Sequence, residues 1–437
     1  MKGLLALVAT ASLANAAAIK ANVNNGKMSD AEVLQDILQH KWLLPDSMYR
    51  SLAARAQGIS KRSPQKIPDI QDTPLPGLSN LLAYEVPKGA PKSTVPEITE
   101  TKTDMWESQH SKRVKVRYGP YRIPPISEAN FQSTYMNVQG MADAFMFSAK
   151  KPCSGDCMIL RLDADLEYAD GSAANNSNGA WLHHAVVFNS GPGVVEPTCG
   201  TGRVENIYMV GNERTTGQFS LPKSEIKSGY PLTAENSLVL STELMNMHDK
   251  EQFVWVAVNY DIVDGHQPEY KAGRTVWMTI GGVSYCGSIY NPFGMSNLTL
   301  MGQPKVKAFS EHSVPWIAPK DGFIMSTGGH MHDGGVSIEV VRNNEVICTS
   351  KPDYSKEGGH SHGMKSKRQM PGGDHTNNDI EHIASQGICL FPEGVPFKKG
   401  DKMYIQANYD FDKHPGMKNK NGELDEVMGI TGALVVW

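Results

Sequence analysis

From about residue 104 to its end, the chain consists of short β-type runs separated by Gly, Pro, Asn and Asp. Val114–Tyr118 and Phe253–Val258 are rich in β-branched and aromatic residues, and Val336–Val340 alternates apolar with polar residues. Many short strands with frequent turn signals are typical of antiparallel sandwiches and jelly rolls. We therefore predict a mostly β protein with two stacked antiparallel β-sandwich, jelly-roll-like domains and little helix.

The N-terminus has the layout of a secretory signal. Lys2 precedes a mainly apolar run from Leu4 to Leu13, and Ala14-Asn15-Ala16 forms a small-residue end. This pattern predicts a cleavable signal peptide over residues 1–16. The apolar run is too short to span a bilayer, and no later run reaches the length of a transmembrane helix. We therefore expect a secreted protein, extracellular or in the cell wall, with no transmembrane segment.

Residues 17–103 differ in composition from the rest. Ser29–Glu32 is a capping box that opens a helical stretch. Residues 63–99 are rich in proline, which favours an extended linker over a packed core. We predict a pro-segment and Pro-rich linker over 17–103, a first β domain over 104–303 and a second over 304–437. Lys61-Arg62 is either a dibasic processing point or an exposed loop with two adjacent charges.

Six cysteines are an even number, which in a secreted chain indicates three disulfides. The count does not fix the connectivity. We predict three pairs: Cys153–Cys157, Cys199–Cys286 and Cys348–Cys389. Asn175 and Asn297 begin Asn-x-Ser/Thr triplets and are predicted glycosylation acceptors.

The charge pattern points away from polyanionic partners. The chain has 42 Lys and Arg and 46 Asp and Glu, a net charge of −4, and the two signs are interspersed. A protein that binds nucleic acid usually carries a basic patch, and one that binds anionic membranes a polybasic segment. We therefore expect no nucleic-acid partner.

An internal near-repeat organises the β region. His183-His184 and His330-Met331-His332 are each followed, about 75 residues later, by an Asn-Tyr-Asp triplet. The triplets begin at Asn259 and Asn408, and His266 and His414 follow shortly after them. Each triplet is also followed by a methionine in a β-like run, Met278 and Met428. The spacing predicts two halves of similar plan, each with a histidine pair.

His330 and His332 have the spacing of a metal-ligand pair on a strand. Alternate residues of a strand project from the same face, about 6.5 Å apart, so two imidazoles can close on one ion. The alternative is two ordinary surface histidines.

His183 and His184 are adjacent, and neighbours on a regular strand point to opposite faces. Both reach one ion only if the strand twists, ends or bulges there. The alternative is one core histidine bonded to backbone and one histidine facing solvent.

Four blocks of the chain carry a resemblance to a known family: Trp181–Phe188, Val258–Ile262, the Gly-rich His330-Met331-His332 and Asp425–Met428. They occur in the order seen in type II copper monooxygenases, the peptidylglycine hydroxylating monooxygenase and dopamine β-hydroxylase group. From Gly328 onward, through Val346-Ile347-Cys348 and Val427-Met428-Gly429, the chain resembles the stress-up-regulated nodulin family of plants even more. The resemblance covers roughly residues 130–437.

The resemblance implies two β domains with one copper ion in each. His330, His332 and Met428 match the oxygen-activating site, where two imidazoles and a soft thioether suit copper. His183 and His184 match two ligands of the electron-supplying site. The position of that site's third histidine falls at Asn259, a poor ligand for reduced copper. Either His266 or His248 takes its place, or the first site is weakened or lost; His414 is a further candidate ligand in the second half.

An intact oxygen-activating site implies hydroxylation of a C–H bond with dioxygen and an external reductant such as ascorbate, on a small-molecule or peptide substrate. One or two copper ions are the expected cofactors. The competing hypothesis is a non-catalytic extracellular metal-binding or structural β-sandwich protein, which Asn259 favours. A serine hydrolase is not supported, because the sequence has no Gly-x-Ser-x-Gly motif.

A second group of histidines and methionines lies in a polar, Gly-rich stretch between residues 354 and 386. It either captures copper or covers a substrate channel, or it is a solvated insertion of biased composition. Its members are His360, His362, Met364, Met370, His375 and His382.

Overall fold

The computed structural model describes residues 84–105, 110–130, 139–198, 204–280, 307–355, 381–416 and 427–437. The regular secondary structure of these residues is strand, apart from one short 3-10 helix, η3 (Asn176–Asn178). None of the described helical segments is long and apolar enough to span a membrane. The prediction of a mostly β, antiparallel architecture is confirmed.

The first unit is a sandwich of two layers. Apolar side chains from both layers meet between them, for example Val116, Leu162 and Val256 on one side and Leu182 and Val187 on the other. Short strands β5 (Ala173–Ala174) and β8 (Gly217–Gln218) pair with one edge of β4. One layer is β1 (Ile98–Lys102), β2 (Lys112–Ile123), β11 (Gln252–Asp264), β4 (Cys157–Glu167) and β9 (Ser228–Leu232); the other is β3 (Met141–Ala149), β10 (Ser237–Asn246), β6 (Ala180–Ser190) and β7 (Val204–Val210).

The second unit is also layered. Its core lies between Ile324 and Val435 of one layer and Ile338 and Ile405 of the other. One layer is β12 (Lys271–Thr279), β22 (Gly429–Val436), β15 (Gly322–Met331) and β20 (Ile388–Phe397); the other is β13 (Ala308–His312), β21 (Lys402–Asp410), β16 (Gly335–Arg342) and β17 (Glu345–Ser350), with β14 (Trp316–Ile317) on β21. A separate pair is formed by β18 (Pro352–Ser355) and β19 (His382–Gln386).

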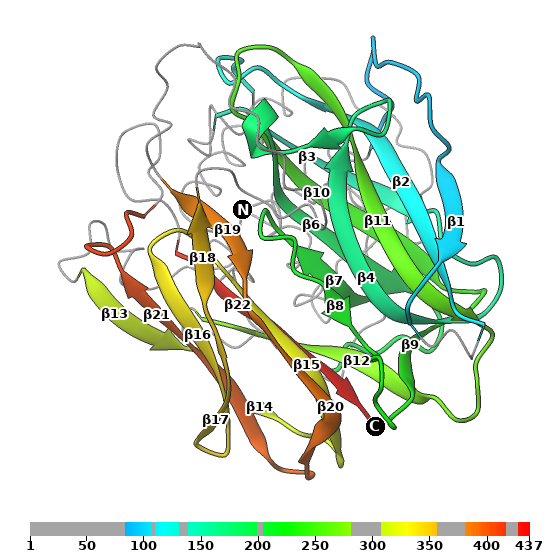
Figure 1. Cartoon of the computed structure of the whole chain (residues 1–437), viewed down its shortest axis with the longest axis vertical. Coiled ribbons are helices and arrows are strands. Elements are labelled where there is room, and N and C mark those ends of the chain that lie inside the picture. Colours follow the sequence, from blue (N-terminus) through cyan, green and yellow to red (C-terminus); the bar gives the residue numbers. More distant parts are fainter. Residues whose placement is uncertain are drawn as a thin grey trace, which may run out of the picture.

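The two units share one sheet and one apolar interface. A short parallel pairing of β9 with β12 joins their layers into a continuous sheet. The outer face of the four-stranded layer, with Val186 and Phe188 of β6, packs against Trp277, Met428 and Ile430 of the second unit. In Figure 1 the blue-to-green strands lie beside the yellow-to-red strands, with β6 and β7 turned toward β22. The interface therefore brings β6 close to β15 and β22.

The C-terminal end of the segment expected to be linker is ordered. Ile98–Lys102 forms β1, which pairs antiparallel with β2, so that Ile98 lies opposite Val116. Ile98, Thr99 and Thr101 are β-branched, which suits a strand. The signal peptide and Lys61-Arg62 lie outside the described residues, and the division into domains stays a prediction.

Two of the predicted disulfides are confirmed. Cys153 is bonded to Cys157, and Cys348 on β17 is bonded to Cys389 on β20, with Cα atoms 6.4 and 6.0 Å apart. Cys199 and Cys286 lie outside the described residues, as does Asn297. Asn175 caps η3 and is half-buried, and its glycosylation stays a prediction.

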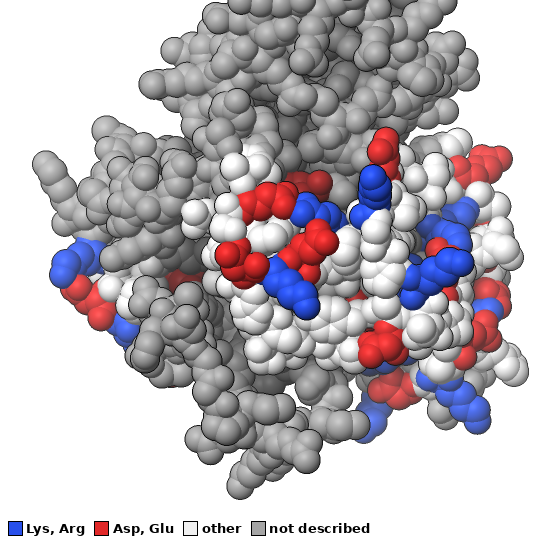
Figure 2. Space-filling model, turned by 90° about the horizontal axis from the view of Figure 1, so that it is seen from above, with Lys and Arg blue, Asp and Glu red and all other residues white. Residues whose placement is uncertain are grey.

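Charged side chains of both signs alternate over the described part of the face shown in Figure 2. Many of the described charges are paired; Arg122, for example, contacts Glu128 at 2.5 Å and Glu251 at 2.7 Å. The mixture seen along the sequence is thus kept on this part of the surface.

Candidate metal centre

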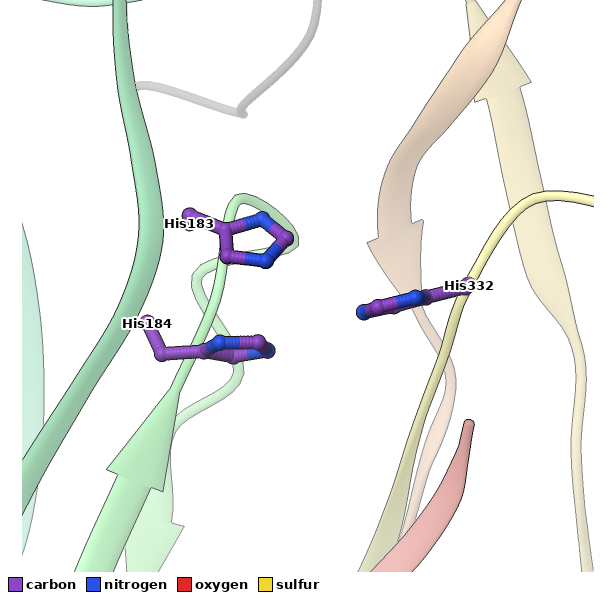
Figure 3. A group of neighbouring side chains, drawn as sticks. All are labelled: His183, His184 and His332. Atoms are coloured by element: carbon purple, nitrogen blue, oxygen red, sulfur yellow. The ribbon is translucent and has the colours of Figure 1, made fainter. Parts of the chain in front are cut away.

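The two predicted histidine pairs meet in one cluster at the interface between the units. Ligand nitrogens of His183, His184 and His332 all lie within 4.8 Å of one another, and Figure 3 shows the two rings of β6 facing His332. The Nε2 atom of His184 lies 3.1 Å from Nε2 of His330. The resemblance implied one site in each domain; the structure brings both pairs to the same place.

A β-bulge lets adjacent histidines share this cluster. Along the β6–β10 ladder, His184 pairs with Glu243 and Leu182 with Leu244, which leaves His183 as the extra residue. A bulged residue re-aims the side chains around it. The ring centroids of His183 and His184 are consequently only 4.2 Å apart. The condition under which both histidines reach one ion is therefore met.

His330 and His332 both contribute to the cluster, although only His330 lies within β15. His330 pairs with Ile430 of β22, and β15 ends at Met331. His332 begins a turn in which its carbonyl accepts a hydrogen bond from the backbone N–H of Gly335. Gly334 has φ +94°, a left-handed conformation that favours glycine. The turn places the His332 ring 5.7 Å from the His330 ring.

Two buried carboxylates support the cluster from behind. Glu243 of β10 lies 2.7 Å from Nδ1 of His184, and Glu213, in the turn after β7, lies 3.0 Å from Nδ1 of His330. An ionised carboxylate only accepts hydrogen bonds, so Nδ1 of His184 donates to Glu243 and Nε2 of the neutral ring keeps its lone pair. This is the usual outer shell of a metal-binding histidine.

Sequence reasoning missed both carboxylates. The only signal was an acidic residue inside the apolar run of β10 and another shortly after β7.

Electrostatics of the cluster favour a cation. Burial, followed by the neighbouring imidazoles of His184 and His332, lowers the pKa of His183 well below its usual value. Burial also lowers the pKa of His184, although Glu243 opposes it.

The carboxylates stay ionised. Burial alone would raise the pKa of Glu213, but His330 and backbone N–H groups outweigh it and lower the pKa to about 2. Burial alone would raise the pKa of Glu243 as well, but the hydrogen bond with His184 together with electrostatic interactions, among them those with His184 and His183, lowers it. The neutral imidazoles of His183 and His184 thus stand before two negative charges.

The distances suit a shared ion. Two nitrogens about 2.0 Å from one metal are roughly 3.1 Å apart when the angle at the metal is near 100°. The observed Nε2 separation of 3.1 Å between His184 and His330 matches this value. Imidazole suits copper, zinc, iron and nickel, so the residues fit a transition-metal ion without selecting which one.

Gly211 makes room for the centre. A Cβ atom there would lie 2.6 Å from Oε2 of Glu213 and 2.8 Å from Cε1 of His330. Its backbone N–H also donates to Oε1 of Glu213 at 3.0 Å. Only glycine lets this backbone approach both side chains.

Position 259 does not face the cluster. Val258 and Tyr260 point into the first core, so Asn259 points to the opposite face of the outer layer. There its Nδ2 donates to Oδ1 of Asp163 at 2.6 Å. The expectation that residue 259 occupies the place of a third ligand of the His183–His184 site is therefore wrong.

Other predicted ligands are dispersed. His248 and His266 are exposed, beyond the ends of β10 and β11. His414 stacks on Tyr354, with ring centroids 3.8 Å apart. His382 contacts Asp333. His360, His362, Met364, Met370 and His375 lie outside the described residues.

Met428 is fully buried in the interface cluster, beside the first residue of β22. The hydroxyl of Tyr409 hydrogen-bonds with its backbone N–H and carbonyl. This is the observed role of the second Asn-Tyr-Asp triplet: it fixes the start of β22. Ligation by Met428 stays a prediction.

Similar proteins were found by sequence. Two solved structures, PNGF-II and the PNGase F of Flavobacterium meningosepticum, resemble the chain with TM-scores of 0.32 and 0.31 and sequence identities of 10% and 9%. The matches cover 75% and 74% of this chain and 66% and 95% of those chains. No protein-family model matches the chain. A protein of Cochliobolus lunatus named "Probable copper-dependent oxygenase clz3" is 27% identical over 63% of this chain and 78% of its own length. Over 77% of its length the chain is also similar, at 28% identity, to "Probable copper-dependent oxygenase M1" of a Phoma species, of which 76% is covered.

Proposed function

We propose that the chain binds one copper ion in the four-histidine cluster and acts as a copper-dependent monooxygenase. One observation carries the proposal: Nε2 of His184 and Nε2 of His330 are 3.1 Å apart, while each Nδ1 contacts a buried carboxylate. Since imidazoles alone do not select copper, the choice of metal rests on the similarity to proteins named as copper-dependent oxygenases.

The chain's own residues would hold and orient the ion. His184 and His330 bind through Nε2, and His183 and His332 complete the set. Glu243 and Glu213 fix the rings that they contact and raise the basicity of the ligating nitrogens. Met428 is a proposed soft donor, supported by its place two residues before Ile430, which pairs with His330.

When bound, copper supplies the activation of dioxygen, with electrons from an external reductant such as ascorbate. The interface supplies a buried setting in which charge interactions are strong. The proposed reaction is hydroxylation of a C–H bond in a small-molecule or peptide substrate. Secretion is part of the proposal, since two disulfides suit an oxidising compartment.

A second candidate is a non-catalytic copper-binding protein. Asn259 is bound to Asp163 on the outer layer. Among the described residues, one group of His, Cys, Asp and Glu side chains has metal-binding geometry, and it consists of His183, His184 and His332. A separate electron-supplying site is therefore not part of the described structure, which favours this alternative.

The test is metal analysis of the purified full-length protein, with copper(II) electron paramagnetic resonance (EPR). We expect about one copper per chain in the wild type and strong loss in His184→Ala and His330→Ala. The exposed His266→Ala variant is the matched control and keeps its copper. Failure of the wild type to retain copper would eliminate both candidates.

Oxygen consumption then separates the two candidates. Copper-dependent consumption of dioxygen in the presence of ascorbate supports the monooxygenase. Bound copper without turnover, across a panel of reductants and substrates, leaves the non-catalytic protein.

A further inference from the structure

Asp333 ties the His332 turn to β19. It directly follows His332 and is buried. Its Oδ2 lies 2.5 Å from Nδ1 of His382, and its Oδ1 accepts a hydrogen bond from the backbone N–H of Ile383 at 3.0 Å. Both carboxylate oxygens of Asp333 are thus engaged by the first two residues of β19.

His382 also contacts the opposite side of the metal centre. Its ring stands edge-on to Trp181, with centroids 5.2 Å apart and an interplanar angle of 62°. Trp181 lies on β6 two residues before His183 and is buried with Met141 and Met245. One side chain therefore touches both the strand that carries His183 and the turn that carries His332.

The neighbouring strand fastens the same turn. The Tyr354 hydroxyl accepts from the N–H of Gly334 at 3.1 Å and donates to the carbonyl of Gly335 at 2.8 Å. Tyr354 of β18 pairs with Ile383 of β19. The position of the turn, and with it the His332 ring, therefore depends on the β18–β19 pair.

We propose that His382 is a positioning residue of the metal centre, which holds the His332 turn against β6 through Asp333 and Trp181. This inference rests on the proposed function, because it concerns how the ligands are held for copper. His382 is partly exposed and contacts Asp333 as His184 contacts Glu243. Its Nδ1 donates to a carboxylate that belongs to the ligand-bearing turn itself.

The test compares four full-length variants: His382→Ala, His382→Asn, His382→Phe and the control His266→Ala. Asn can keep an N–H donor at the place of Nδ1, and Phe keeps a ring beside Trp181. Urea unfolding establishes that each variant is folded. Copper affinity is measured by competition with a chromophoric chelator, and ligand geometry by copper(II) EPR.

We expect His382→Ala to weaken copper binding by about 10-fold, at the lower end of the range for loss of a direct partner of a ligand ring, because His382 acts through Asp333; it should also change the EPR hyperfine coupling. His382→Asn recovers part of the affinity and the spectrum, and His382→Phe recovers less than Asn. His266→Ala behaves as the wild type.

Two outcomes overturn the inference. One is a His382→Ala protein with the affinity and spectrum of His266→Ala. The other is a loss in His382→Asn as large as that in His382→Ala, because the link to Asp333 would then not be the cause. A wild-type protein that binds no copper refutes the proposed function itself. This outcome differs from a failure of the inference about His382, because the wild type and all four variants then lack copper.

Discussion

The Nε2 atoms of His184 and His330 lie 3.1 Å apart, although 146 residues separate them along the chain. His184 belongs to β6 of the first unit and His330 to β15 of the second. The centre is therefore a product of how the two units pack. Changes to the packing residues around it should affect metal binding as strongly as changes to some ligands.

The buried carboxylates give the first prediction. Glu213→Gln and Glu243→Gln keep the side-chain volume but remove the negative charge beside Nδ1 of His330 and His184. Each should weaken copper binding by about 10- to 100-fold, measured by chelator competition. The exposed Glu235→Gln serves as the control. Equal affinities in all three variants would show that the carboxylates have no part in holding the ligands.

The close approach of Gly211 gives the second prediction. Gly211→Ala places a methyl group against His330 and Glu213, and such overpacking costs about 1–3 kcal/mol. We expect a lower free energy of unfolding in urea together with weaker copper binding. Gly155→Ala is the matched control, because nothing lies within 4 Å of the added atom. A Gly211→Ala protein as stable as Gly155→Ala would contradict the described packing.

A buried acid away from the metal centre gives the third prediction. Burial raises the pKa of Glu205 from 4.5 to about 7, although Arg274 and the Tyr230 hydroxyl oppose the rise. A raised pKa means that the folded state binds more protons than the unfolded state between these two values. The contribution of Glu205 to stability is therefore fully present below pH 4.5. It is lost as the pH rises through about 7, which lowers the free energy of unfolding by up to ~3 kcal/mol.

Glu205→Gln cannot ionise and should flatten this dependence. Urea unfolding at several values between pH 4.5 and 8 measures it, with the exposed Glu235→Gln as control. The same slope in wild type and Glu205→Gln would refute the assignment.

The disulfides give the fourth prediction. Cys348 and Cys389 are 41 residues apart, and Cys153 and Cys157 only 4. In the loop-entropy model the longer loop contributes about 4 kcal/mol and the shorter about 2 kcal/mol. The double variant Cys348→Ser/Cys389→Ser should therefore lower the free energy of unfolding more than Cys153→Ser/Cys157→Ser does. The reverse order would show that strain or residual structure outweighs loop length.

Local geometry was the part of the site that could be predicted from sequence. The alternation of a strand predicts His330 and His332 on one face; their rings do lie 5.7 Å apart, although β15 ends at Met331 and a turn carries His332. A strand that twists, ends or bulges at His183-His184 would let both rings reach one ion. The sequence does not show which of the three occurs, because a bulge depends on the register with β10.

Long-range packing was the part that could not be predicted. Nothing in the spacing of the two halves shows that their histidine pairs face each other across an interface. The expectation for Asn259 was wrong for the same reason. Its distance from His184 along the chain matches the family pattern, but its side chain points away from the core into which Val258 and Tyr260 point. Glu213 and Glu243 carry no motif, and only the fold places them behind the rings.

The four histidines of the centre come from β6 in the first unit and from β15 and the turn after it in the second unit, and β9 and β12 join the two units. This arrangement determines when the centre can form during folding. Neither half alone presents more than two of the four imidazoles. During synthesis the complete centre therefore cannot exist before the C-terminal half has emerged and docked. Binding of the proposed metal ion would then be a late event that reports whether the whole molecule has assembled correctly.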